Sequence, residues 1–211
     1  MAFPSVLLLE GQDDYHVVSN LLDAHDLQDR FSLRPKDGIE QLLGSLAVEL
    51  KGSDLQHLGL VVDANEAPAA RWQKVTDTLR QCGFPNLPPQ PDPEGTVVQM
   101  EGKPTVGVWL MPDNRVSGTI EDFAAILVPR CDPLWPRAQT CLDSIPGTDR
   151  RFAPMHHSKA LIHTWLAWQE EPGVRMGAAI TRKYLDPRAS QAVLFIAWLR
   201  RLTASAAAPG P

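Results

Sequence analysis

The 211-residue sequence has no apolar run of the ~18 residues that a membrane-spanning helix needs. Its N-terminus, Met-Ala-Phe-Pro, lacks the basic region of a signal peptide, and the apolar run that follows is too short for one. The cysteines, Cys82, Cys131 and Cys141, are odd in number and fall at no metal-ligand spacing. They fit free thiols better than a disulfide framework. We therefore expect a soluble cytoplasmic protein with no membrane partner.

Several catalytic motifs are also missing. No Gly-x-Gly-x-x-Gly follows the first apolar run, and Gly102-Lys103 lacks the upstream spacing of a phosphate-binding loop and precedes Pro104. The chain contains no nucleophile elbow and no His-Glu-x-x-His. The sequence thus gives no support for dinucleotide binding, for a P-loop nucleotide hydrolase, or for these two classes of hydrolase.

The net charge of the chain is small, but its two parts differ in the sign of their charge. The net charge is −5, which gives no overall attraction to nucleic acid. Residues 1–129 hold 19 acidic and 9 basic side chains, whereas residues 130–211 hold 6 acidic and 11 basic ones. An acidic half suited to cations thus precedes a basic half suited to phosphates. A chance division of solvated surface charge is the alternative.

The apolar pattern predicts an α/β fold. Short apolar runs alternate with helical periodicity three times before residue 84, which is typical of a parallel sheet with right-handed crossovers. Residues 84–94 contain five prolines and are expected to form a loop. We expect a Rossmann-like domain whose central, mainly parallel sheet has four strands and is flanked by helices. The runs that predict strands are residues 5–9, 31–33, 58–62, 96–99 and 105–110, of which 105–110 is the fourth core strand.

The C-terminal third is predicted to be helical. Helical patterns cover residues 120–128, 157–169 and 188–202, and the last is apolar over much of its circumference. We expect an α/β core over residues 1–129 and a helical extension over residues 130–202 that packs on it. Residues 203–211 are small, end in Pro and Gly, and are expected to be disordered.

Two carboxylates follow predicted parallel strands. Glu10 follows the apolar run Val6–Leu9, and Asp63 follows Leu58–Val62. If the two strands are neighbours, their carboxyl ends meet at one edge of the sheet, where like charges repel unless a cation intervenes. Oxygen ligands favour Mg²⁺ over Zn²⁺, which prefers His and Cys. Taken singly, a carboxylate at a strand end is more often a helix cap or a surface residue than a metal ligand.

This arrangement resembles the toprim family. Glu10-Gly11 after one strand and Asp63-Ala64-Asn65 after another are similar to the toprim signature of a Glu and an Asp-x-Asp pair. The segments Pro112–Phe123 and His156–Lys159 are similar to the toprim half of overcoming-lysogenization-defect nucleases. The resemblance is strongest to small stand-alone bacterial toprim-like proteins and covers about residues 5–165. It implies a Mg²⁺- or Mn²⁺-dependent nuclease that hydrolyses phosphodiester bonds of DNA or RNA.

The resemblance also assigns roles to residues. Glu10 would be a metal ligand and the acid/base group, and Lys159 would stabilise charge on the scissile phosphate. The further implied ligands of one or two metal ions are Asp14 (with Asp13 as a substitute), Asp63, Asn65, Glu121 and Asp122.

Asn65 departs from the motif, which has aspartate there. An amide oxygen can ligate Mg²⁺ but adds no negative charge, so a second ion would be held more weakly. Glu66 is the neighbouring carboxylate. A degenerate toprim domain that acts as a binding or regulatory module is therefore the alternative function. The two-domain nucleases of this group carry an ATPase domain that this chain lacks, so any such partner would be a separate protein.

Weaker signals concern nucleic-acid binding. His156, Lys159 and His163 share one helical face, which could grip phosphate or could simply face solvent. The pair Arg182-Lys183 could contact a nucleic-acid backbone, and surface solubility explains it almost as well. The tryptophans of the C-terminal helices lie on apolar stripes and favour a core position over base stacking.

Overall fold

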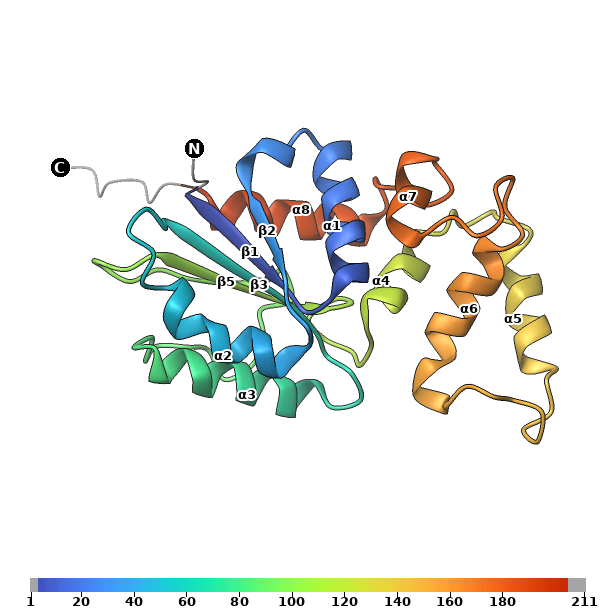
Figure 1. The fold of residues 1–211 in the computed structure, drawn as a ribbon, viewed down its shortest axis with the longest axis horizontal. Helices are drawn as coiled ribbons and strands as arrows, with labels where there is room; N and C mark the ends of the chain where they lie inside the picture. The colour runs from blue at the N-terminus through green and yellow to red at the C-terminus, as the bar shows by residue number, and fades with distance from the viewer. Residues whose placement is uncertain (1–3, 205–211) are drawn as a thin grey trace.

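The computed structural model describes residues 4–204 (Figure 1). Most of the tail expected to be disordered, residues 205–211, lies outside the described residues. The strands are β1 (Ser5–Leu9), β2 (Ser32–Pro35), β3 (His57–Asp63), β4 (Thr96–Val98) and β5 (Thr105–Met111). The helices are α1 (Gln12–Ala24), α2 (Ile39–Glu49), α3 (Pro68–Gln81), α4 (Ile120–Ile126), α5 (Trp135–Asp143), α6 (His157–Leu166), α7 (Met176–Thr181) and α8 (Ser190–Leu202), with short 3₁₀ turns at Gln28–Arg30 and Pro154–His156.

The five strands form a single mixed sheet in the order β2-β1-β3-β5-β4. β1 pairs in parallel with β2 and β3, and β3 pairs in parallel with β5. β4 pairs antiparallel with β5 and forms one edge. The sheet therefore has five strands, and the prediction of a four-stranded sheet was wrong. β4 and β5 are separated by only residues 99–104, a connection too short for the crossover that a parallel pair requires, so β4 turns back along β5.

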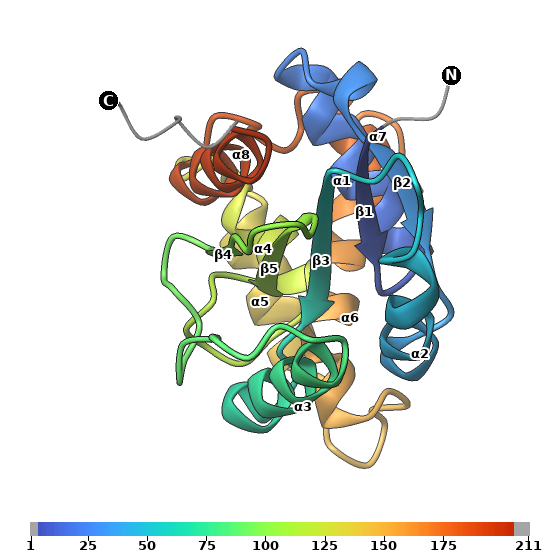
Figure 2. The same ribbon diagram turned by 90° about the vertical axis from the view of Figure 1, so that its left-hand side faces the viewer.

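Helices cover both faces of the sheet (Figure 2). On one face, Val6 and Leu8 of β1 pack with apolar residues of α2 and α3. On the other face, Leu7 and Leu9 pack with residues of α1, α4 and the C-terminal helices. Successive side chains of a strand point to opposite faces, so a continuous apolar run such as Val6–Leu9 suits a strand covered on both sides. The α/β class and the mainly parallel sheet are thus confirmed.

Helix α8 approaches the sheet closely because the strands beneath it carry glycine. A Cβ atom at Gly107 of β5 would lie 3.0 Å from both Trp198 and Leu202 of α8. A Cβ at Gly59 of β3 would lie 3.0 Å from Leu202 and 2.3 Å from Leu7. Trp198 is fully buried, and its indole N–H donates to the Thr96 carbonyl oxygen at 3.0 Å. The final helix therefore belongs to the layer that covers the sheet.

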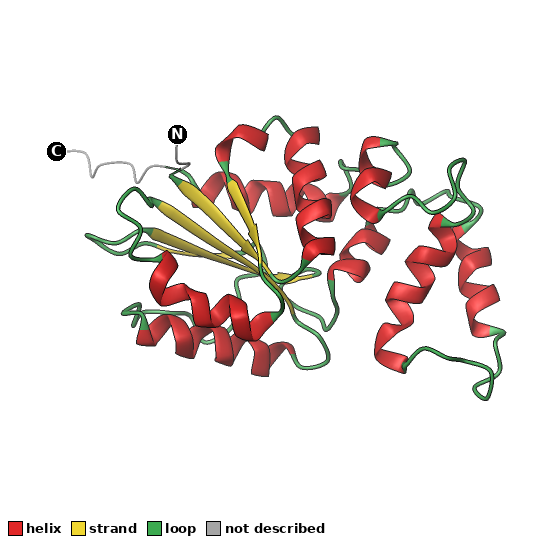
Figure 3. Ribbon diagram, viewed as in Figure 1, coloured by secondary structure: helices red, strands yellow, loops and turns green. Residues whose placement is uncertain are grey.

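The remaining C-terminal helices extend the molecule beyond the carboxyl ends of the strands. α7 packs against α1, and a Cβ at Gly177 would lie 2.4 Å from the His16 carbonyl oxygen. α5 and α6 pack against each other, and Figure 3 shows them as a pair that projects away from the sheet. α6 also contacts α4. None of the described helices is long and apolar enough to cross a membrane.

Candidate functional site

The carboxyl ends of β1 and β3 form the centre of the candidate site. β1 and β3 are neighbours in the sheet. From β1 the chain first passes to β2 on one side of β1, and it then crosses to β3 on the other side and continues to β5. In open α/β sheets, ligands bind outside the strand ends at such a reversal of direction. Glu10 directly follows β1, and Asp63 is the last residue of β3. The Asp63 backbone N–H donates to Glu10 Oε2 at 3.0 Å, so the two strand ends are directly linked.

Asp14 joins the cluster from the first turn of α1. The helix begins immediately after Gly11, where a Cβ would come within 3.3 Å of Asp14 Oδ2. The Asp14 side chain is buried, at 4% exposure. Burial, reinforced by the charge of Glu10, raises its pKa from 3.8 to about 7. The site therefore holds a carboxyl group whose charged form is costly at neutral pH.

Asp63 and Glu121 complete a group of four carboxylates. Burial first, and then the charge of Asp14, raises the pKa of Asp63 well above its ordinary value. Glu121 lies in the first turn of α4 and is buried at 6% exposure. The Thr119 hydroxyl donates to Glu121 Oε2 at 2.8 Å. The carboxylate cluster, defined as Glu10, Asp14, Asp63 and Glu121, thus comes from three separate segments of the chain: the β1–α1 junction, the end of β3 and the start of α4.

Two basic side chains flank the carboxylate cluster. Lys159 Nζ lies 2.9 Å from Glu121 Oε1 and 3.1 Å from Asp13 Oδ2. Partial burial alone would lower the pKa of Lys159, but the hydrogen bond and charge of Glu121, together with Asp13, raise it, so the lysine is charged. On the other side, Arg71 Nη1 lies 3.8 Å from Glu10 Oε2. The Arg71 side chain is only 13% exposed.

The oxygen atoms of the cluster are donors of the kind that a divalent cation prefers. Within residues 4–204, no three His, Cys, Asp or Glu side chains stand as a ready metal-binding group. Two carboxylate oxygens are nevertheless suited to ligation. Asp14 Oδ1 and Asp63 Oδ1 are buried and accept no hydrogen bond from the described part of the chain. Buried polar atoms usually have partners, and a hard cation is a partner that also relieves the repulsion between these acids. The donor set therefore fits Mg²⁺ or Mn²⁺, with Glu121 shared with Lys159.

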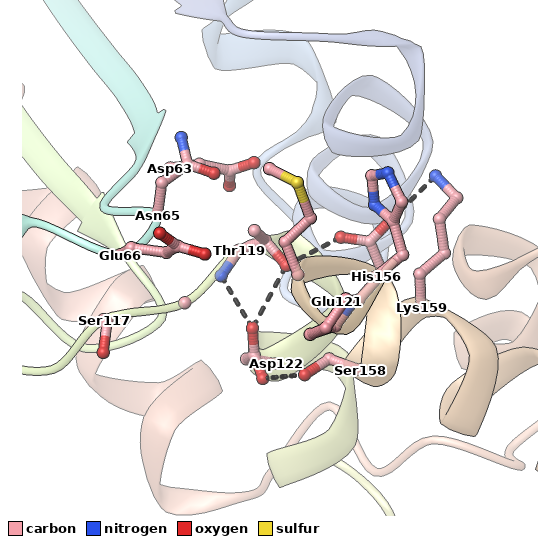
Figure 4. Close-up of a pocket in the computed structure, with 13 residues that line it drawn as sticks. Asp63, Asn65, Glu66, Ser117, Thr119, Glu121, Asp122, His156, Ser158 and Lys159 are labelled. Atoms are coloured by element: carbon pink, nitrogen blue, oxygen red, sulfur yellow. Dashed lines mark hydrogen bonds and ion pairs between the residues drawn. The ribbon is translucent and has the colours of Figure 1, made fainter. Parts of the chain in front are cut away.

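Two adjoining cavities open at the cluster. One, of about 280 Å³, is lined by all four carboxylates, by residues 11–13 and 120, and by Lys159. The other, of about 580 Å³, is lined by residues of the β3–α3 and β5–α4 connections and of the α6 start. Asp63, Glu121 and Lys159 line both cavities. Figure 4 shows Lys159, His156 and Glu121 on one side of the larger cavity and Asp63, Asn65 and Glu66 on the other.

Asn65 lies beside the cluster in a left-handed backbone conformation. Its φ is +53°, a region that Asn and Asp adopt more readily than other residues with side chains. Its backbone N–H and C=O both bond to Gly118, which ties the β3–α3 turn to the segment before α4. Asn65 lines the larger cavity only. The left-handed backbone conformation favours a short polar side chain at this position, and aspartate would fit it as readily as asparagine.

Asp122, expected as a metal ligand, has both oxygens engaged in hydrogen bonds. Its Oδ2 accepts from the Thr119 backbone N–H at 2.8 Å, in a capping box that begins α4. Its Oδ1 accepts from the Ser158 hydroxyl. Figure 4 shows both bonds as dashed lines. Asp122 thus joins α4 to the start of α6 and so positions Glu121 and Lys159.

The residues expected to bind nucleic acid are only partly brought together. His156 lines the larger cavity, where it belongs to the 3₁₀ turn that precedes α6. His163 is exposed on α6 and lines neither of the two cavities. Arg182 pairs with Glu171, and Lys183 is exposed; both follow α7, away from the cavities. The buried tryptophans Trp165 and Trp198 confirm the core interpretation, whereas Trp168 is 40% exposed.

Sequence reasoning missed three contributors: Arg71, Thr119 and Ser158. The sequence did contain a signal for Arg71. It lies directly before Trp72 and four residues before Val75, and both of these belong to the buried face of α3, so Arg71 borders that face. A basic residue at the edge of a buried helical stripe, soon after a strand-end carboxylate, is a natural counter-ion. Thr119 bonds to Glu121, two residues away, and forms a capping box with Asp122, so the local Thr-x-x-Asp pattern could have marked it. Ser158 bonds to Asp122, 36 residues away, and no local pattern marks it.

The fold and site define a Rossmann-like α/β protein with a carboxylate cluster at the carboxyl ends of its parallel strands. A family model described as "Protein of unknown function (DUF3226)" matches residues 4–204, and the chain belongs to this family. Comparison with curated proteins and with solved structures found no match.

Proposed function

We propose that the protein is a toprim-type nuclease that uses Mg²⁺ or Mn²⁺ to hydrolyse phosphodiester bonds of DNA or RNA. The observation that carries the proposal is the carboxylate cluster with its two unbonded oxygens, Asp14 Oδ1 and Asp63 Oδ1. The cluster is joined by a charged lysine, and it opens into a cavity of about 580 Å³. The sequence resemblance to toprim proteins supports the same chemistry independently of the geometry.

We assign the following roles to the side chains of the site. Asp14 and Asp63 would hold the cation, with Glu121 beside it, and the cation would supply Lewis-acid stabilisation of the charge that develops on the phosphate. Glu10, fixed by the Asp63 N–H, accepts the proton of the attacking water. Lys159 Nζ faces both cavities and donates to a phosphate oxygen, while Arg71 keeps Glu10 in place.

The substrate enters through the larger cavity. Its rim carries His156 and Met155, both exposed, which could meet the sugar-phosphate backbone and a base. The excess of basic residues after position 129 supplies the electrostatic attraction. We further propose that the protein acts in the cytoplasm together with a separate ATPase protein, which would take the place of the ATPase domain of the two-domain nucleases.

The alternative is a non-catalytic module that binds nucleic acid or a protein. The observation that favours it is the internal neutralisation of the cluster, because Lys159 pairs with Glu121 and Arg71 approaches Glu10, so the chain's own cations offset part of the negative charge. Asn65, in place of an aspartate, agrees with this alternative. A chain that had lost its metal would retain such ion pairs.

Cleavage assays separate the two functions. Purified protein is incubated with supercoiled plasmid, single-stranded DNA and RNA in Mg²⁺ or Mn²⁺. The nuclease proposal predicts cleavage that EDTA, Glu10→Gln and Asp63→Asn each abolish. The matched control is Asp54→Asn. Asp54 is an exposed carboxylate in the α2–β3 connection, at the amino end of β3 and away from the site, so this variant should cleave normally. No wild-type cleavage, combined with cleavage gained in Asn65→Asp, would establish the degenerate alternative.

A further inference from the structure

We infer that the site binds a single divalent cation and that the Lys159 ammonium serves as its second positive centre. The inference deepens the proposed function and depends on it. Three properties of the described residues support it: the charge balance of the cluster, the shortage of free carboxylate oxygens around Asn65, and the position of Lys159.

The charge balance suits one cation. The cluster contains four carboxylates that are buried or nearly so, and Arg71 and Lys159 lie against two of them. With the exposed Asp13 left out because solvent screens its charge, these four negative and two positive groups leave two negative charges, which one divalent ion cancels. A second divalent ion would leave an excess of two positive charges in a half-buried site, where an unbalanced charge is costly.

The groups around Asn65 offer little to a second ion. A second ion on the side of the larger cavity would take ligands from Asp63, Asn65 and the start of α4. Asn65 adds no charge, and both oxygens of Asp122 already accept hydrogen bonds. Glu66 is exposed beside them. Mg²⁺ loses water reluctantly and depends on carboxylates, so these groups are a poor second site.

Lys159 occupies the position where the missing charge is needed. Its Nζ bridges Glu121 and Asp13, and its side chain lines both cavities. Glu121 is thereby neutralised from the side that a second ion would approach. Asp122 and Ser158 fix the α6 start that carries Lys159, so the ammonium is held there by the fold. A permanent lysine charge thus replaces an exchangeable ion.

Mn²⁺ titration followed by electron paramagnetic resonance of the free ion tests the inference without relying on activity. We expect one Mn²⁺ per chain in the wild type and still one in Asn65→Asp, because Lys159 remains. The double variant Asn65→Asp/Lys159→Met should bind two. The controls Asn65→Asp/Lys159→Arg, which keeps the charge, and Asn65→Asp/Lys51→Met, which removes an exposed lysine elsewhere, should each bind one. Intrinsic tryptophan fluorescence checks that every variant is folded.

The outcomes are distinguishable. Two ions in the wild type would overturn the inference and leave the proposed nuclease standing. No bound ion would overturn both. Two ions in Asn65→Asp alone would show that the missing carboxylate, and not Lys159, sets the number. A single ion in Asn65→Asp/Lys159→Met, with the fold intact, would likewise exclude the role given to Lys159.

Discussion

Replacing Asp14 with Asn should stabilise the metal-free protein at pH 8 and weaken its binding of Mn²⁺. Asp14 is buried, and its pKa is raised from 3.8 to about 7, mainly by desolvation and then by the charge of Glu10. A shift of about three units corresponds to about 4 kcal/mol between the neutral and charged forms, at 1.36 kcal/mol per unit. Asn has nearly the same shape and stays neutral. After local relaxation we expect a gain of about 1–3 kcal/mol in the free energy of unfolding.

The pH dependence has a definite sign. Between pH 3.8 and about 7, folded Asp14 keeps its proton while the unfolded chain loses it. The contribution of this group to stability is therefore complete below pH 3.8 and is lost as the pH rises to about 7. In Asp14→Asn that loss disappears. The difference in stability between variant and wild type should thus grow from pH 5 to pH 8.

Urea denaturation in EDTA at pH 5 and pH 8, followed by tryptophan fluorescence, measures this difference. Asp13→Asn is the matched control, because Asp13 is 45% exposed and its partner, Lys159, is 48% exposed and keeps Glu121 as a second partner. Its stability should change by less than about 1 kcal/mol. With Mn²⁺ added, the wild type should gain stability and Asp14→Asn should gain less. An Asp14→Asn protein that is less stable than the wild type at pH 8 in EDTA would show that the charged form of Asp14 does not destabilise the fold.

Three further predictions follow from the contacts of the site and the sheet. Arg71→Met removes the cation 3.8 Å from Glu10, so calorimetry should show Mn²⁺ bound on the order of tenfold more tightly, and weaker binding would contradict this. Lys159→Met should slow cleavage by about a hundredfold or more while Mn²⁺ affinity does not fall, since Lys159 acts on the phosphate; a fall in affinity would contradict the assignment. Gly107→Ala should cost about 1–3 kcal/mol in urea denaturation, because the new Cβ would crowd Trp198 and Leu202. The control Gly44→Ala, in open space on α2, should instead stabilise by about 0.5–1 kcal/mol.

The sheet and the centre of the site could be predicted from local patterns. Uninterrupted apolar runs such as Val6–Leu9 indicated strands buried on both faces, and parallel strands bring their carboxyl ends together. Glu10 and Asp63 are linked by a hydrogen bond as a consequence. β4 was assigned as a strand but left out of the sheet, because a three-residue edge strand carries little periodic signal.

The surroundings of the site could not be predicted in the same way. Asp122 was expected among the ligands because it is acidic and adjacent to Glu121, yet it caps α4 and accepts from Ser158, which is 36 residues away. Arg71 approaches Glu10 across the start of α3. Such contacts depend on how α3, α4 and α6 are placed around the strand ends, and composition and spacing within one segment do not encode that placement.

Diffraction from crystals soaked in Mn²⁺, with anomalous data collected at the manganese edge, would show whether the carboxylate cluster is a metal centre. We expect one anomalous peak per chain, bounded by Asp14 Oδ1 and Asp63 Oδ1 with Glu10 and Glu121 nearby, and Lys159 still in contact with Glu121. Absence of a peak at the cluster in crystals soaked to saturation would contradict the claim that this is a metal centre. Two peaks would keep the metal centre and contradict the role given to Lys159.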